Sequence, residues 1–150
     1  MKLEIPSALK AEHEALHDTL RKATQEPGGL GDAAKAVAKL LHPHFVKEEA
    51  YALPPLGLLR DLAQGRLTPE MKEVLQFTDR LKTDFGQMLE EHKLIVAALD
   101  KLSAAAKKAN KMEYAEFADA LILHAQTEEE VSYPTAILIG EYVREKLRLR

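Results

Sequence analysis

Two stretches of this chain, HFVKEEAYALP at residues 44–54 and HAQTEEEVSYP at residues 124–134, decide its fold. Both read His-x-x-x-Glu-Glu-x-x-x-x-Pro, with the same spacing at every named position. A Glu-His pair precedes each stretch, at residues 12–13 and 91–92, and its histidine lies 31 or 32 residues before that of the stretch. A pattern that recurs with matched spacing indicates an internal repeat. The chain is therefore predicted to contain two copies of one helix hairpin.

Four long segments carry apolar residues at steps of three and four, and no run alternates as a half-buried strand does. The first helix is predicted to begin near Pro6 or Ser7 and to end before Pro27. The second begins after Asp32, a plausible N-cap, and continues through a kink at Pro43. The predicted fold class is an all-α, antiparallel up-down four-helix bundle.

The other two long helices belong to the second copy. Residues 54–67 are too apolar for a flexible linker and are expected to form a packed connector. A helical stretch then runs from Thr68 to about Lys108, with an interruption near 84–86 left open. Another helix begins near Met112 and ends or bends at Pro134. We expect a short C-terminal helix after it, over residues 135–147.

Composition limits the class of protein. With 150 residues and 46% hydrophobic residues, the chain is predicted to form a single domain over residues 1–150. No apolar run is long enough for a membrane span and no secretory signal is visible, so we expect a soluble cytoplasmic protein. A net charge of -3 disfavours nucleic acid as a partner, despite basic residues near the C-terminus. Since cysteine is absent, a metal would be held by imidazole and carboxylate.

Six polar residues stand on helix faces that should be apolar. Burying such groups without partners would cost roughly several kcal/mol each. If the two copies pack face to face, these side chains converge inside the bundle, because residues four apart lie on one helix face. We therefore predict that they are metal ligands. The six are His13, His44, Glu48, His92, His124 and Glu128.

The number and type of these ligands indicate the kind of centre. Six ligands exceed what one tetrahedral structural zinc ion needs. They suit two ions bridged by carboxylate and by a water, hydroxide or oxo group. Mixed nitrogen and oxygen ligation favours iron, although the same set would also bind Mn, Zn or Co. The predicted cofactor is a pair of iron ions.

Other polar residues near these positions are expected to have other roles. His17 is expected at the helix surface or bundle end rather than as an extra ligand, and His42 is expected to point away from the site. Glu49 and Glu129 recur in both copies, so they could form hydrogen bonds to ligand imidazoles or be solvated. The two aromatic residues near the site, expected to pack in the core with the hydroxyl at a polar edge, are Tyr51 and Tyr133.

The double pattern Glu-His … His-x-x-x-Glu-Glu … Pro, over about residues 9–134, resembles the hemerythrin-like HHE cation-binding domains. The resemblance implies an antiparallel four-helix bundle around a non-haem di-iron centre. Carried over position by position, it implies the same ligands that the repeat selects: His13, His44, Glu48, His92, His124 and Glu128.

This sequence departs from the oxygen-carrying hemerythrins at two places. Those proteins have a second histidine one turn after the first in the third helix, where this chain has Val96. They also have an aspartate five residues after the last-helix histidine, whereas this chain offers Glu128 at four residues and Glu129 at five. An imidazole-rich set underlies reversible O2 binding in that family. The departures therefore argue against an oxygen carrier, and leave the fold and the metal centre as implied.

The predicted function is that of a hemerythrin-like di-iron protein. It would bind or sense O2, NO or peroxide, or handle iron itself. One alternative is a di-iron oxidase or peroxidase, although a binding role is favoured over an enzyme. A second alternative is an all-α interaction module without a functional metal. No nucleic-acid or membrane partner is expected, and a homodimer or a second protein partner is left open.

Overall fold

The structure, a computed structural model, describes residues 1–150. It contains helices and no strand, so the predicted all-α class is confirmed. The long helices are α1 (Ser7–Thr24), α2 (Gly28–Lys47), α4 (Leu75–Lys108), α5 (Met112–Thr127) and α6 (Tyr133–Lys146). The short elements are the π-helices η1 (Glu48–Ala52) and η4 (Glu128–Ser132), the 3-10 helices η2 (Pro54–Leu58) and η3 (Pro69–Val74), and α3 (Leu59–Ala63).

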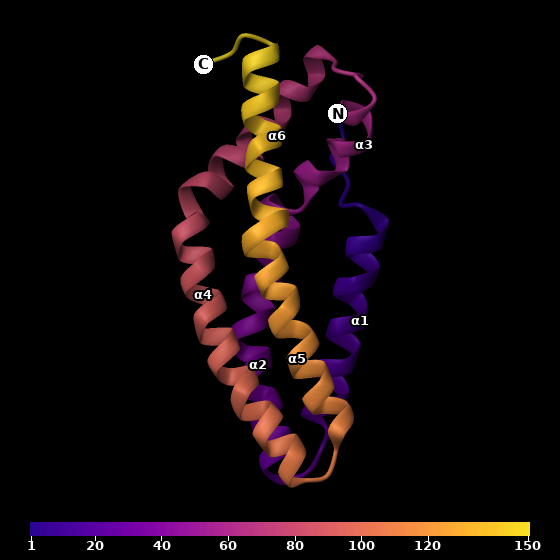
Figure 1. Cartoon of the computed structure of the whole chain (residues 1–150), viewed down its shortest axis with the longest axis vertical. Helices are drawn as coiled ribbons and strands as arrows, with labels where there is room; N and C mark the ends of the chain where they lie inside the picture. The colour runs from indigo at the N-terminus through magenta and orange to yellow at the C-terminus, as the bar shows by residue number, and fades with distance from the viewer.

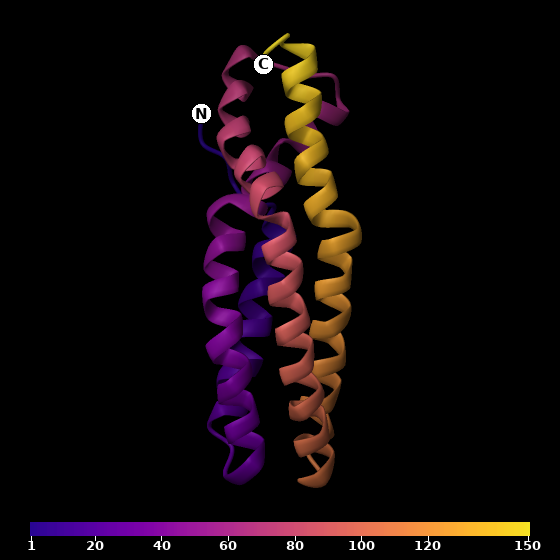
Figure 2. The ribbon, with the colours of Figure 1, turned by 90° about the vertical axis from the view of Figure 1, so that its left-hand side faces the viewer.

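The molecule is an elongated bundle with two apolar cores, one above the other. In its lower part α1, α2, α4 and α5 run antiparallel to their neighbours along the chain (Figure 1). In its upper part α6 packs against the first half of α4 and the short elements. Seen from the side, α5 and α6 follow one another as nearly one rod (Figure 2). The lower core centres on residues such as Leu41 and Leu99, and the upper core on Leu81 and Met88.

The connection between α1 and α2 differs from the prediction. Helix α2 begins at Gly28, after Pro27, so Asp32 lies inside the helix and is not its N-cap. The glycines that suggested a longer break allow a close approach instead. A Cβ atom at Gly31 would collide with the backbone carbonyl of Glu26, so only glycine fits there. The turn between the helices is therefore tighter than predicted.

The second copy also shows where tertiary packing overrides local signals. Helix α4 continues without interruption through Gly86, because buried side chains on both sides, Leu81 and Met88, hold this segment against the upper core. The C-terminal helix starts at Tyr133, two residues earlier than predicted. The first part of the connector, residues 54–58, is packed as expected, since Pro55 and Leu56 are buried, whereas most of residues 59–67 are exposed.

A π-helix directly follows each His-x-x-x-Glu segment. The first begins at Glu48, and the backbone N–H of Leu53 donates to the Glu48 carbonyl, five residues back, at 2.8 Å. The second begins at Glu128. Single π-helical turns within helices often accompany functional sites. No helix has the length and hydropathy of a membrane-spanning segment.

Candidate metal centre

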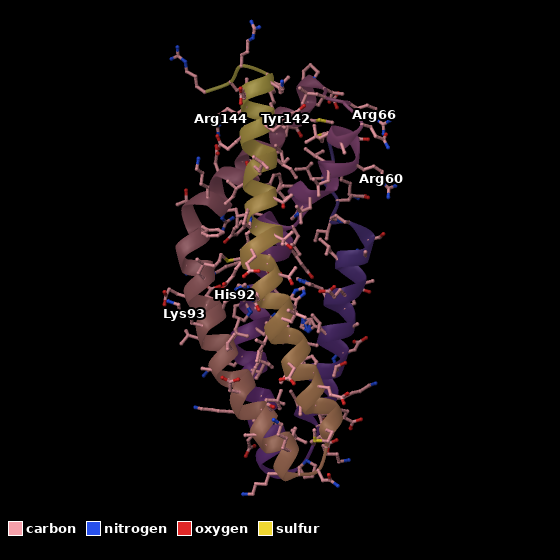
Figure 3. The ribbon with its side chains drawn as sticks, in the orientation of Figure 1. Arg60, Arg66, His92, Lys93, Tyr142 and Arg144 are labelled. Carbon is pink, nitrogen blue, oxygen red and sulfur yellow. The ribbon has the colours of Figure 1, made fainter.

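All six predicted ligands converge where the two apolar cores meet. Five of them are almost completely buried, and His124 is only slightly exposed, at 11% of its side chain. His92 lies inside the bundle at mid-height, whereas its neighbour Lys93 projects from the outer face of α4 (Figure 3). Each long helix of the lower bundle contributes one histidine, and each π-helix contributes a glutamate. We call these six side chains the inner cluster.

The inner cluster divides into two groups that share one carboxylate. His44, Glu48, His92 and Glu128 offer ligand atoms that lie within 4.8 Å of one another, and so do His13, His124 and Glu128. The Glu128 Oε1 atom lies 3.3 Å from His92 Nε2, and its Oε2 atom lies 3.2 Å from His124 Nε2. Glu128 therefore faces both groups, one with each oxygen atom. Either group could therefore hold a metal ion.

Each inner imidazole turns its Nδ1 atom towards a glutamate from another element. We call these glutamates the outer carboxylates. A carboxylate that accepts the Nδ1–H of a histidine fixes the ring orientation and leaves the Nε2 lone pair available for a metal. The pairs are His44–Glu91 (2.8 Å), His92–Glu129 (3.0 Å) and His124–Glu12. Glu49 faces His13 Nδ1 at 3.7 Å, beyond hydrogen-bond distance.

The outer carboxylates occupy corresponding positions in the two copies of the repeat. In both copies the glutamate of the Glu-His pair contacts the imidazole of the other hairpin, as Glu12 does with His124. One outer carboxylate carries an extra contact, because Lys47 donates to Glu91. Burial acts to raise the pKa of Glu91, but the hydrogen bonds from Lys47 and His44 outweigh it and hold that pKa below its usual value. Glu91 therefore stays an ionised acceptor for His44.

The centre of the cluster holds many acceptors and few donors. With Nδ1–H directed outward, the Nε2 atoms of His44 and His92 face each other as lone pairs only 2.9 Å apart. Four inward atoms are buried without any hydrogen-bond partner: His13 Nε2, His124 Nε2, Glu48 Oε1 and Glu128 Oε2. Each such group costs about 1–3 kcal/mol when nothing satisfies it. Cations between these atoms would satisfy all of them, so the residues present fit bound metal.

Titration of the buried carboxylates follows from the same geometry. Burial, together with the negative charge of Glu128, raises the pKa of Glu48 well above its usual value. Burial also lowers the pKa of His44, so this imidazole is neutral at pH 7. Carboxyl and imidazole groups must lose their protons to act as ligands, so cations would bind here in competition with protons.

Tyr133 is the one phenol that reaches the inner cluster. Its hydroxyl donates to Glu48 Oε2 at 2.6 Å and lies 3.2 Å from His44 Nε2 and 3.3 Å from His92 Nε2. Burial, and then the charge of Glu48, raise the pKa of Tyr133, so the phenol keeps its proton. Tyr51 behaves differently, since its hydroxyl donates to Asp84.

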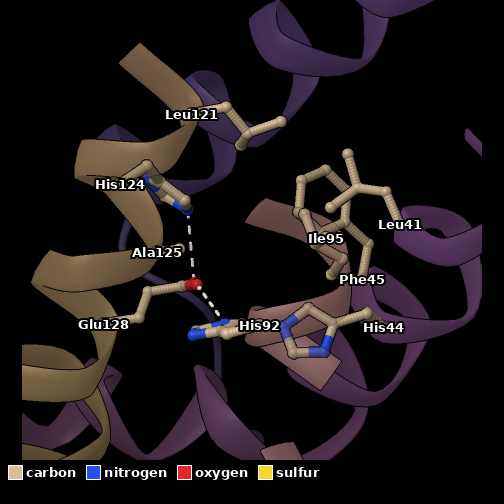
Figure 4. Close-up of a pocket in the computed structure, with 9 residues that line it drawn as sticks. All are labelled: Leu41, His44, Phe45, His92, Ile95, Leu121, His124, Ala125 and Glu128. Carbon is tan, nitrogen blue, oxygen red and sulfur yellow. Dashed lines mark hydrogen bonds and ion pairs between the residues drawn. The ribbon is translucent and has the colours of Figure 1, made fainter. Parts of the chain in front are cut away.

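A small cavity touches the inner cluster on the side of the lower core. Its volume is about 10 Å³, close to the space for one water molecule. His44, His92, His124 and Glu128 line one side, and the close-up shows apolar side chains on the other (Figure 4). The apolar lining residues are Leu41, Phe45, Ile95, Leu121 and Ala125.

Several polar residues that were not predicted as ligands also lie near the inner cluster. His17 and His42 lie outside both groups, with their rings 6.0 Å apart nearer the surface. Glu129 lies 3.0 Å from His92 Nδ1, as the hydrogen-bonding role requires, whereas Glu49 makes no hydrogen bond to His13 and its side chain is 53% exposed. Sequence reasoning missed the contacts of Glu12 and Glu91, although their recurrence before each histidine was a signal. The prediction that Tyr133 packs in the core with its hydroxyl at a polar edge is confirmed, but no helical periodicity identified Glu48 as the partner of that hydroxyl.

Comparison with known proteins identifies the family. A protein-family model described as Hemerythrin HHE cation binding domain matches residues 4–136, a range that contains the whole inner cluster. No curated protein and no solved structure matched the chain. The family's description agrees with the buried histidine and glutamate cluster, which is able to hold metal. On the breadth of this match, the chain belongs to the hemerythrin HHE cation-binding domain family.

Proposed function

We propose that the inner cluster holds two iron ions and that the protein uses them to bind a small ligand such as O2, NO or peroxide. His44, His92 and Glu48 would hold one ion, His13 and His124 the other, and Glu128 both. The convergence of buried acceptor atoms that lack hydrogen-bond partners carries this proposal. When bound, iron would supply a Lewis-acidic and redox-active centre.

The chain's own residues prepare the site in three ways. The outer carboxylates hold the imidazole rings so that Nε2 points inward. Tyr133 keeps a proton at its hydroxyl beside Glu48 and both imidazoles of the first group. Apolar side chains such as Phe45 and Ile95 keep bulk water away from the cavity. A dry, shaped cavity strengthens the interactions of a ligand with charged groups.

The size of the cavity supports a ligand of very few atoms. A space of about 10 Å³ next to the inner cluster has room for about one water molecule and is too small for an organic substrate. Handling of iron itself, as storage or transfer, uses the same residues and needs no cavity. Retention of the metal on dilution would favour ligand binding over iron handling.

A peroxide-consuming enzyme is the second candidate. The position of Tyr133 favours it, because a phenol among acceptors can deliver a proton to a reacting ligand. Steady consumption of peroxide in the presence of a reductant would support the enzyme. A lasting change in the absorption spectrum on addition of NO or O2, without turnover, would support binding or sensing.

Metal stoichiometry after anaerobic addition of Fe(II) tests the main proposal. Wild-type protein should retain two irons per chain after gel filtration. His44→Ala and His124→Ala should each lose at least one. His42→Ala is the matched control, because this exposed histidine lies two residues from His44 and outside the inner cluster. Wild-type protein without bound iron, or equal iron in all variants, would refute the proposal. Parallel loading with Zn(II) and Mn(II) would show which metal the protein retains in the largest amount per chain.

A further inference from the structure

A polar groove opens on the surface beside one end of the inner cluster. It has a volume of about 160 Å³, which is room for several water molecules. No apolar side chain lines it, and its three carboxylates outnumber its one guanidinium. The lining residues are His13, Glu14, His17, Asp18, Arg21 and Glu49.

His13 connects this groove to the interior. Its side chain is only 3% exposed and stacks on the ring of Phe45, with centroids 4.3 Å apart. Neither of its ring nitrogens has a hydrogen-bond partner. The Nδ1 atom lies 3.7 Å from Glu49, whose side chain is 53% exposed, and Nε2 lies 3.8 Å from Glu128. One edge of this buried imidazole therefore faces the groove and the other faces the inner cluster.

The groove breaks the symmetry of the repeat. Aligning the Glu-His pair of one copy on that of the other shows which residues replace the groove residues Glu14, His17 and Asp18. The matching residues of the second copy are Lys93, Val96 and Ala97. One acidic residue is thus replaced by a basic one and the other by alanine. Both copies supply matching ligands to the inner cluster, so the ligands do not account for the acidic residues that only the first copy has beside His13.

We propose that the groove is a docking site for hydrated divalent cations, which enter the inner cluster at the His13–His124 end. The inference rests on the proposed function. A hydrated ion cannot use the cavity of about 10 Å³, but it fits the groove. Carboxylates there attract it and replace part of its hydration shell. Glu49 supplies the next carboxylate inward, beside the edge of His13 that faces the groove, and His13 Nε2 lies on the far edge of that ring, 3.8 Å from Glu128.

The rate of metal uptake tests this proposal. Co(II) is a suitable probe, because its absorption spectrum changes on binding and it is stable in air. The groove variant Glu14→Lys/Asp18→Ala gives these positions the residues of the second copy. The control Glu70→Lys/Asp32→Ala changes the net charge equally at two exposed positions outside the groove. Stopped-flow absorption at low ionic strength would follow uptake by all three proteins.

We expect the groove variant to take up Co(II) about tenfold more slowly than wild type and to reach the same two ions per chain. The control should load at nearly the wild-type rate. High salt should reduce the difference, since it screens exposed charges. Equal rates for the groove variant and the control would overturn this inference and leave the proposed function intact. Wild-type protein that binds neither Co(II) nor Fe(II) would overturn both.

Discussion

At the scale of residues, the orientation of the imidazoles depends on groups outside the inner cluster. His44 and His92 direct Nδ1 towards Glu91 and Glu129, and therefore direct Nε2 inward. Without those carboxylates the rings could rotate or exchange the proton between their nitrogens. The acceptor-rich interior that suits a cation is thus a product of ten side chains rather than six.

Removal of an outer carboxylate should weaken metal binding. Glu91→Ala takes away the partner of His44 Nδ1, and loss of such partners commonly lowers metal affinity by about 10–100-fold. Glu90→Ala is the control, since the neighbouring carboxylate is exposed and pairs only with Lys93. Titration with a metal-chelating dye would measure both affinities. Equal affinities for the two variants would contradict this role of Glu91.

Removal of the Tyr133 hydroxyl should affect both stability and the site. Tyr133→Phe deletes the hydrogen bond to Glu48 and should lower the unfolding free energy of the metal-free protein by about 1–2 kcal/mol. It should also change the spectrum of bound Co(II). Tyr51→Phe loses a comparable bond, to Asp84, outside the inner cluster. Urea denaturation and absorption spectra would test the pair, and a Co(II) spectrum altered equally by both variants would contradict the assignment.

At the scale of elements, the π-helices set which residues face the site. Tyr133 follows Glu128 by five residues, which on an α-helix would turn it about 140° away. The wider turn of η4 contains one extra residue. Tyr133 therefore has the direction that the fourth residue after Glu128 would have on an α-helix, about 40° from that of Glu128. The same turn in η1 brings the apolar Leu53 to the matching position. The two hairpins thus differ in what they place beside the ligands.

The contact between α4 and α6 also depends on one residue. A Cβ atom at Gly140 would lie 2.6 Å from the Cβ atom of Thr78, which is buried and β-branched. We expect Gly140→Ala to lower the unfolding free energy by about 1–3 kcal/mol, as overpacking does. Gly86→Ala on α4 meets no atom and should instead stabilise by up to about 1 kcal/mol. Urea denaturation would measure the stability of both variants. Stabilisation by Gly140→Ala would contradict the tight contact between α4 and α6 at Thr78.

At the scale of the whole molecule, the polar cluster interrupts what would otherwise be one continuous apolar core. The lower core ends at Phe45 and Ile95, the upper core begins at Met88, and the buried acceptors lie between them. Their desolvation weakens the metal-free fold, and bound cations would offset this cost. Stability of this bundle should therefore depend on metal.

Metal should stabilise the protein by mass action. At about 100 times its Kd, an ion that binds only the folded state adds about 2.7 kcal/mol to the unfolding free energy. Glu128→Leu should abolish this gain, because it removes the carboxylate that both groups share. Urea denaturation with metal and with a chelator would test both statements. An equal metal-dependent gain in wild type and Glu128→Leu would contradict the argument.

Local signals were sufficient where neighbours along the helix decide the structure. The helical class, the hairpin repeat and the placing of His44 with Glu48 on one face follow from spacing. Local signals failed where distant groups decide it. The Gly86 position stays helical because its flanks are buried against the upper core, and α2 begins early because Gly31 fits against Glu26.

By itself, the sequence determined that the chain forms helices and that six polar side chains would face the same interior. Only the tertiary structure decided that Glu128 faces both groups, that Glu12 and Glu91 orient imidazoles of the opposite hairpin, and that Tyr133 reaches Glu48. The physical reason is the range of the interactions. Helical periodicity depends on residues three or four apart, whereas these contacts join elements far apart in the chain and depend on how the hairpins pack.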